Sequence, residues 1–172
     1  MKETISNIVL IGMPGSGKST VGVILAKMLS KDFIDTDVLI QVSEGRSLQD
    51  IVDTDGHLAL RALEENQLLA LNCKNNVIAT GGSAVYSEKA IRHLKSDAVL
   101  VFLDVNLHNL LKRVYDFSTR GLAKSPEQSF AELFEERIEL YREFADITVK
   151  GSGFTQEEVC EEIIRILNSD QE

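Results

Sequence analysis

The chain has 172 residues, a length that one hydrophobic core accommodates, so we expect a single domain spanning residues 1–172. Hydrophobic residues make up 44% and charged residues 26%, which excludes disordered and collagen-like classes. The net charge of −9 gives a surface that repels phosphate backbones and anionic lipid. We therefore expect neither nucleic acid nor a membrane among the partners.

The sequence also lacks the patterns that are typical of membrane, secreted, disulfide-rich and metal-binding proteins. No apolar run approaches the roughly 20 residues that span a bilayer, and the N-terminal segment has no secretory cleavage signature. Cys73 and Cys160 are isolated, and the three histidines are scattered, so a disulfide framework and a metal held by protein ligands alone are both disfavoured. We predict a cytoplasmic protein and expect a monomer.

Short apolar runs alternate with helical periodicity along the chain. In chain order the patterns predict a strand at residues 8–11, a helix after a glycine loop, a strand at 33–34, helices from 47 and over 57–71, strands at 77–79 and 98–103, helices over 106–113 and 130–145, a strand at 147–149, and a helix from 155. This alternation predicts an α/β fold with a mostly parallel sheet between two layers of helices. Ligands of such sheets bind at the carboxyl ends of the strands, where the glycine-rich and acidic clusters fall.

The most specific motif is the glycine-rich loop of residues 12–19, which matches G-x-x-x-x-G-K-S between a predicted strand and a predicted helix. Its glycines let backbone N–H groups face phosphates, and the helix start adds positive potential. Lys18 is expected to reach the β- and γ-phosphates, and the Ser19 hydroxyl to ligate Mg²⁺. An ordinary strand–turn–helix connection is the weaker interpretation. The residues predicted to bind ATP here are Gly15, Ser16, Gly17, Lys18, Ser19 and Thr20.

An ordered series of further motifs follows this loop. They are Asp35-Thr36-Asp37, Gly45-Arg46-Ser47, Asp53-x-Asp55-Gly56, Leu60-Arg61-x-x-Glu64, Thr80-Gly81-Gly82-Ser83, Arg120 and Glu136-Arg137-x-x-x-Tyr141-Arg142. In this order and spacing, residues 7–167 resemble the shikimate kinase family, small relatives of the nucleoside monophosphate kinases. The resemblance implies a three-layer P-loop fold with a five-stranded parallel sheet, a substrate-binding region at about residues 33–70 and a mobile lid at about 114–126.

The two aspartates after the second strand take different roles by this resemblance. Asp37 would bond the acceptor hydroxyl, which in-line phosphoryl transfer needs aligned and relieved of its proton. Asp35 would lie nearer the metal and hold a Mg²⁺-bound water. The competing interpretation is that one of them, Asp37 included, caps the following helix.

Arg61 and Arg137 resemble the two arginines that clamp the substrate carboxylate in this family. A guanidinium fork matches a carboxylate bidentately, so two such arginines select a small acid. Glu64 and Glu65 lie one helical turn after Arg61 and are expected to hold it. The alternative for each arginine is a solvated helix face with surface ion pairs.

A glycine pair, Gly81-Gly82, lies directly after the predicted strand at residues 77–79. Backbone without a Cβ lets a substrate ring approach closely, so we expect these glycines to line the acceptor site. The family pattern has a third glycine, and this chain has Ser83 instead. That serine is either a tolerated variation or the mark of a different acceptor.

Two more arginines resemble residues that contact the nucleotide. Arg120 lies in the predicted lid, where closure would bring its charge to the transferring phosphoryl group. The family usually follows this arginine with proline, and this chain has Gly121. Arg113 resembles the arginine that lies against adenine, although a basic residue at a helix end also suits the helix dipole.

Three functional hypotheses follow. The first is transfer of the γ-phosphate of ATP to shikimate, a step of aromatic amino-acid biosynthesis, with Mg²⁺ as cofactor. The second is a kinase of the same fold acting on another small hydroxylated acid such as homoserine or gluconate, which Ser83 and Gly121 favour. The third is a nucleotide-binding module without catalysis. Intact Lys18, Ser19 and Asp37 argue against that module, because a site without chemistry has no need of them.

Overall fold

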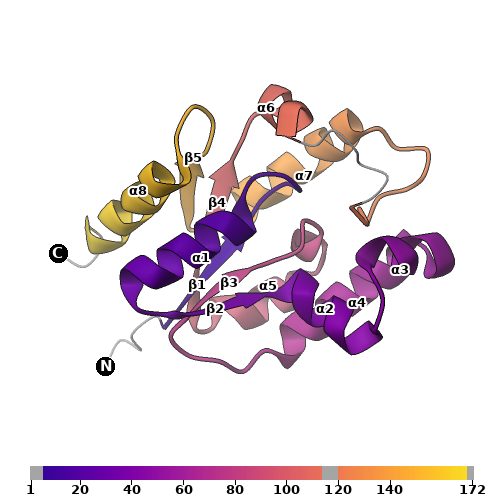
Figure 1. Cartoon of the computed structure of the whole chain (residues 1–172), viewed down its shortest axis with the longest axis horizontal. Helices are drawn as coiled ribbons and strands as arrows, with labels where there is room; N and C mark the ends of the chain where they lie inside the picture. The colour runs from indigo at the N-terminus through magenta and orange to yellow at the C-terminus, as the bar shows by residue number, and fades with distance from the viewer. Residues whose placement is uncertain (1–5, 114–119, 170–172) are drawn as a thin grey trace.

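The computed structural model describes residues 6–113 and 120–169, and its centre is a five-stranded sheet in the order β2-β3-β1-β4-β5 (Figure 1). The strands are β1 (Asn7–Ile11), β2 (Asp32–Asp35), β3 (Asn76–Ala79), β4 (Ala98–Asp104) and β5 (Ile147–Lys150). Every neighbouring pair is parallel, and in the centre Leu10 pairs with Ala79 on one side and Val101 on the other. The predicted five-stranded parallel sheet is confirmed.

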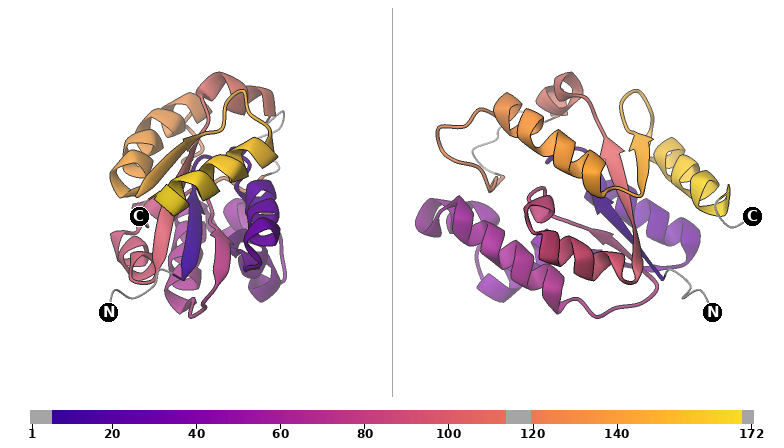
Figure 2. Two further views of the ribbon diagram at one scale, coloured as in Figure 1. Left: turned by 90° about the vertical axis from the view of Figure 1, so that its left-hand side faces the viewer. Right: turned by 180° about the vertical axis from the view of Figure 1, so that it is seen from behind.

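Helices cover both faces of this sheet (Figure 2). They are α1 (Lys18–Leu29), α2 (Thr36–Glu44), α3 (Leu48–Asp55), α4 (His57–Ala70), the 3-10 turn η1 (Ala84–Tyr86), α5 (Glu88–Lys95), α6 (Leu107–Arg113), α7 (Phe130–Phe144) and α8 (Gln156–Ser169). Ile8 and Leu10 point to the core under α1 and α8, whereas Val9 and Ile11 point to the core under α5 and α7. Strands buried on both faces explain the uninterrupted apolar runs of the sequence.

A smaller core lies beyond the carboxyl end of β2, where α2, α3 and α4 pack together (Figure 1). Its buried residues are Ile40, Ile51, Leu60 and Ala123. The first three come from those three helices, and the fourth comes from the segment that precedes α7. This core therefore joins the predicted substrate-binding region to residues 120–123, the described end of the predicted lid.

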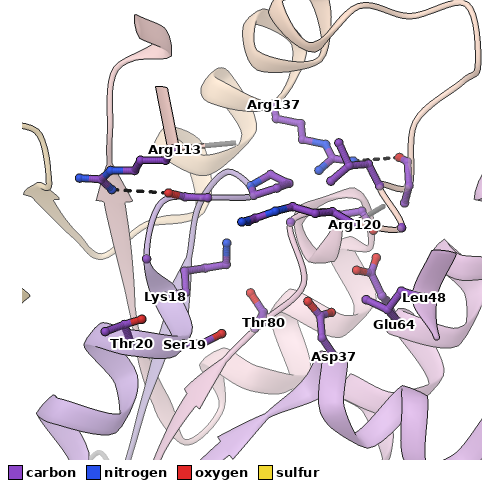
Figure 3. A pocket seen from close by; sticks show the side chains of 18 residues that line it. Lys18, Ser19, Thr20, Asp37, Leu48, Glu64, Thr80, Arg113, Arg120 and Arg137 are labelled. Carbon is purple, nitrogen blue, oxygen red and sulfur yellow. Dashed lines mark hydrogen bonds between the residues drawn. The ribbon is translucent and has the colours of Figure 1, made fainter. Parts of the chain in front are cut away.

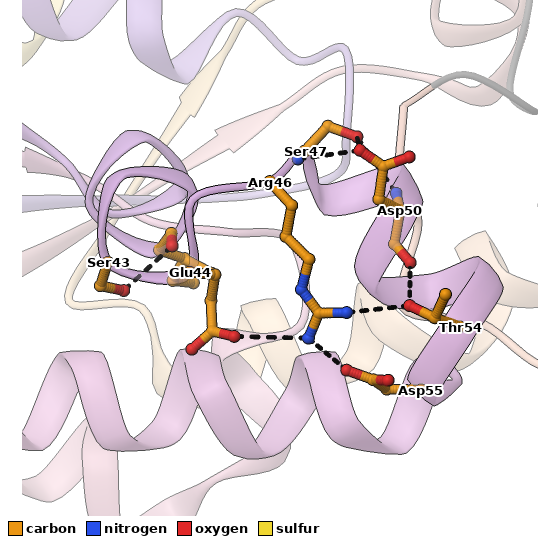
Figure 4. A network of polar contacts seen from close by, with 8 residues as sticks. Ser43, Glu44, Arg46, Ser47, Asp50, Thr54 and Asp55 are labelled. Carbon is orange, nitrogen blue, oxygen red and sulfur yellow. Dashed lines mark hydrogen bonds and ion pairs between the residues drawn. The ribbon is translucent and has the colours of Figure 1, made fainter.

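The connection from α2 to α3 is fixed by a polar network around Arg46 (Figure 4). The Arg46 guanidinium pairs with Glu44 and Asp55 and donates to the Thr54 hydroxyl at 2.9 Å. Ser47 caps α3 in the predicted capping box, with Asp50 as its reciprocal partner. The network ties the end of α2 to both ends of α3.

The sequence patterns missed η1 and α5, and they gave no bounds for α2, which was expected only as the helix that an aspartate after the second strand would cap. The buried face of α5 consists only of Ala90, Ile91 and Leu94, which is too short a stripe to stand out among charged residues. In the last turn of α1, Met28 is 44% exposed, whereas Leu29 packs against the core. Residues 114–119 of the predicted lid lie outside the described residues. Within the described ranges, none of the helices is long and apolar enough to cross a membrane.

Candidate active site

A cleft of about 450 Å³ lies at the carboxyl ends of the central strands (Figure 3). The glycine-rich loop forms one wall, and residues 120–123 with Leu48 of α3 form the opposite side. Asp37, Glu64 and Arg137 reach the same space from α2, α4 and α7. These residues come from six separate parts of the chain and meet in one cleft, as expected for a site at this edge of a parallel sheet.

The phosphate-binding loop is built on glycines that adopt positive φ. Gly12, Gly15 and Gly17 have φ angles of +149°, +81° and +95°, which L side chains rarely adopt. Gly17 is also the N-cap of α1, so the loop delivers the helix N-terminus to the cleft. The buried Lys18 ammonium donates to the carbonyls of Gly12 at 2.8 Å and Met13 at 2.9 Å, and burial lowers its pKa to about 8. This geometry suits an anionic phosphate chain.

Next to the loop, Ser19 and Asp35 bring two oxygen atoms together. The Ser19 hydroxyl donates to the Asp35 carboxylate at 2.5 Å, and the other carboxylate oxygen accepts the N–H groups of Asp37 and Val38. Asp35 is thus the N-cap of α2, which confirms the capping interpretation for Asp35 and excludes it for Asp37. Hard oxygen donors beside a phosphate loop suit Mg²⁺. The described residues contain no group of three or more acidic, histidine or cysteine side chains that could hold a metal alone.

Two carboxyl groups line the cleft, the buried Glu64 and the partly buried Asp37. Burial raises the pKa of Asp37 to about 6, against the opposing effect of Lys18. Burial also raises the pKa of Glu64 to about 8, with the Asp37 charge as the next cause. Within the described part of the chain, Asp37 Oδ1 and Glu64 Oε2 have no hydrogen-bond partner. A Cβ on Gly81 would lie 1.9 Å from Glu64 Oε1, so only glycine admits this packing.

The two predicted clamp arginines meet at one backbone oxygen. Arg137 is 1% exposed, and its Nη2 donates to the Ala123 carbonyl at 2.9 Å while its Nε donates to the Tyr86 hydroxyl at 3.3 Å. Arg61 Nη2 donates to the same carbonyl at 3.4 Å, and its guanidinium stacks 3.7 Å from the centre of the Tyr86 ring. The two guanidinium groups therefore lie together, and the Ala123 carbonyl and Tyr86 hold them.

The remaining predicted residues lie at different depths. Arg113 lines the cleft and donates to the carbonyls of Gly15, Ser16 and Gly151 at 3.3–3.5 Å. Arg120 is exposed and extends over the cleft (Figure 3). The cleft is also lined by Thr20, Gly82 and Ser83. Gly81 is not among the lining residues and lies against the Glu64 side chain. Arg61 lines a neighbouring open hollow.

With this geometry in place, residues 14–168 match the family model described as shikimate kinase. The chain belongs to the shikimate kinase family. It is 41% identical over 158 residues to the shikimate kinase of Aquifex aeolicus, covering 91% of this chain and 93% of that one. It is 40% identical over 162 residues to the one from Caldanaerobacter subterraneus, covering 92% and 94%.

Solved structures agree. A shikimate kinase from Acinetobacter baumannii in complex with shikimate superposes with a TM-score of 0.89 at 32% identity, covering 98% of this chain and 96% of that chain. The Aquifex aeolicus enzyme gives a TM-score of 0.82 at 40% identity, covering 96% and 98%. The chain is accordingly an ATP-dependent kinase with the P-loop fold predicted from its motifs.

The sequence did not predict that Glu64 lines the cleft or that Tyr86 contacts both arginines. Glu64 and Glu65 were expected to hold Arg61, but among the described residues neither forms an ion pair with it. The Glu65 carboxylate instead accepts a hydrogen bond from the Ser87 hydroxyl. A signal for Glu64 was present, because Leu60, Glu64 and Leu68 form the buried stripe of α4. No local pattern marks Tyr86.

Replacing Glu64 with glutamine is expected to stabilise the kinase in a pH-dependent way. The folded protein keeps the Glu64 proton up to about pH 8, whereas the unfolded chain releases it near its usual pKa of 4.5. The stability of the parent therefore falls as pH rises through this window, and a neutral glutamine avoids that loss. The Tm advantage of Glu64→Gln should grow from pH 5 to pH 8. An equal advantage at both pH values, or the same trend in Glu65→Gln, contradicts the expectation.

Proposed function

We propose that the chain transfers the γ-phosphoryl group of ATP to a hydroxyl of shikimate, giving shikimate 3-phosphate and ADP. The observation that carries the proposal is that one cleft joins Lys18 of the phosphate loop, the partly buried carboxyl of Asp37 and the buried guanidinium of Arg137. These three groups match, in order, a phosphate chain, an acceptor hydroxyl and a carboxylate.

ATP binds with its phosphates on the loop. The N–H groups at the start of α1 and the Lys18 ammonium face the β- and γ-phosphates, and binding them keeps that ammonium charged. Arg113, anchored on loop carbonyls, lies where the adenine end leaves the cleft. Arg120 reaches over the cleft and neutralises charge on the transferring group.

The acceptor lies between Asp37 and the two clamp arginines. Arg137 in the cleft, joined by Arg61 at the shared Ala123 carbonyl, holds the carboxylate, while the Gly82 backbone and Ser83 line the wall beside the ring. The Asp37 carboxylate, with a pKa of about 6, is ionised at neutral pH and accepts the hydroxyl proton. The hydroxyl oxygen then bonds to the γ-phosphorus, and the bond to the bridging oxygen breaks as ADP leaves.

The Ser19 hydroxyl and the Asp35 carboxylate fit Mg²⁺, since both are hard oxygen donors held 2.5 Å apart beside the loop. Ser19 would ligate the ion, and Asp35 would hold one of its waters. When bound, Mg²⁺ neutralises charge on the phosphate oxygens. We include a cytoplasmic location, a monomeric state and the absence of nucleic-acid partners in the proposal; the two free cysteines, Cys73 and Cys160, support a reducing compartment.

The test is steady-state ADP release from MgATP with shikimate, homoserine, gluconate or no acceptor. We expect turnover with shikimate at about 1–100 per second and background release otherwise. Turnover with another acid and none with shikimate would overturn the acceptor assignment. It would direct attention to Ser83, whose buried hydroxyl has no hydrogen-bond partner among the described residues.

A further inference from the structure

Residues 120–123 are docked on the start of α3 by one side chain. The Gly121 N–H donates to Gln49 Oε1 at 2.8 Å. Gly121 has a φ of +60°, and a Cβ there would lie 2.4 Å from the backbone carbonyl carbon of Leu48. The backbone of this segment therefore lies directly against the α3 backbone, closer than any residue with a Cβ would allow.

Residues on both sides of Gly121, Arg120 and Ala123, line the cleft. On one side Arg120 extends over it (Figure 3). On the other side Ala123 is 4% exposed in the small core, and its carbonyl accepts hydrogen bonds from Arg137 and Arg61. Moving residues 120–123 would therefore displace one arginine directly and remove the oxygen that orients two others.

Gln49 is itself held in place. Its Nε2 donates to Asp53 Oδ1, one turn further along α3, at 2.7 Å. The helix is in turn fixed by the Ser47 capping box and the Arg46 network (Figure 4). Both polar ends of the Gln49 amide are thus used, one within α3 and one on Gly121.

We propose that Gln49 is a positioning residue that holds residues 120–123 over the cleft through the Gly121 N–H. It places Arg120 for phosphoryl transfer and the Ala123 carbonyl on the clamp arginines without touching substrate. The kinetic part rests on the proposed function, whereas the contact is measurable without turnover.

The contact is tested by amide exchange of ¹⁵N-labelled protein. Gln49→Met keeps side-chain length and helix propensity but removes both hydrogen bonds, and Gln67→Met on α4, outside the cleft lining, is the matched control. We expect the Gly121 N–H to exchange about tenfold faster or more in Gln49→Met only. Equal exchange in the parent and Gln49→Met would overturn the proposal, whatever the acceptor proves to be.

Kinetics then test the consequence. In Gln49→Met, kcat with ATP and shikimate should fall about two- to tenfold, the effect of one net hydrogen bond, with the KM for ATP within about twofold. Gln67→Met should match the parent. A parent without shikimate turnover would refute the proposed function and leave the exchange test of Gln49 intact.

A paired exchange of donor and acceptor separates positioning from general stability. In Gln49→Glu with Asp53→Asn, the new carboxylate accepts from Gly121 and from the new amide, so both contacts return. This variant should restore slow Gly121 exchange and kcat to within about twofold of the parent. If Gln49→Met lowers kcat only in proportion to a fall in Tm, Gln49 has a structural role and the proposal fails. The proposal also fails if the paired variant restores neither slow Gly121 exchange nor kcat.

Discussion

Asp37→Asn is expected to lower kcat by about 10²–10⁴-fold while MgATP binding is retained. Asparagine has the shape of aspartate but cannot accept the hydroxyl proton. The Asp37 Oδ1 atom has no partner among the described residues, so the substitution breaks no hydrogen bond of that atom. Because burial raises the pKa of Asp37, the neutral side chain should not lower the Tm at pH 7. Steady-state turnover measures the fall in kcat, calorimetric titration with MgATP measures the retained binding, and thermal unfolding at pH 7 measures the Tm.

The matched control is Asp32→Asn, an exposed aspartate at the other end of β2. It should leave kcat and nucleotide affinity at parent values. If Asp37→Asn kept more than about a tenth of the parent kcat, Asp37 would be an orienting group at most, and proton acceptance would have to be assigned elsewhere.

Arg137→Lys is expected to reduce kcat/KM for shikimate by about 10²–10³-fold, mostly through KM. Lysine keeps the charge but loses the planar fork that bonds a carboxylate bidentately. It also cannot reach both the Ala123 carbonyl and the Tyr86 hydroxyl, the contacts that now orient the guanidinium. The carboxylate does not change during transfer, so its binding is equal in ground and transition states, and KM carries the effect.

Arg142→Lys on the same helix is the control, because Arg142 is exposed and pairs with Glu139 on the surface. It should leave kcat/KM unchanged. A change in the KM for ATP as large as that for shikimate in Arg137→Lys would contradict a role at the carboxylate, as would an unchanged KM for shikimate.

The fold and the phosphate loop were predictable because their signals are local. Buried parallel strands appear as apolar runs, and a glycine loop followed by Lys18 at a helix start occurs within eight residues. Asp37 was predictable as a site residue because it follows a strand end. The family resemblance supplied the pairing of Arg61 with Arg137, which no periodicity contains.

What the sequence did not predict is the set of long-range contacts that orient those residues. Arg137 and Tyr86 are 51 positions apart, and Gln49 and Gly121 are 72 apart. Such pairs depend on how α3, η1 and α7 pack, and the spacing of residues along the sequence does not predict this packing. The Ala123 carbonyl is a further case, since a backbone oxygen leaves no trace in residue identity.

In the proposed function, Asp37 and the clamp arginines organise a small hydroxylated acid beside the phosphate loop. The most direct measurement is a crystal structure of this chain with shikimate and MgADP. We expect the carboxylate within hydrogen-bond distance of Arg137 and Arg61, and one hydroxyl within about 3.2 Å of the Asp37 carboxylate. Shikimate bound with its carboxylate away from both arginines, or with no hydroxyl at Asp37, would contradict the proposed placement of the acceptor.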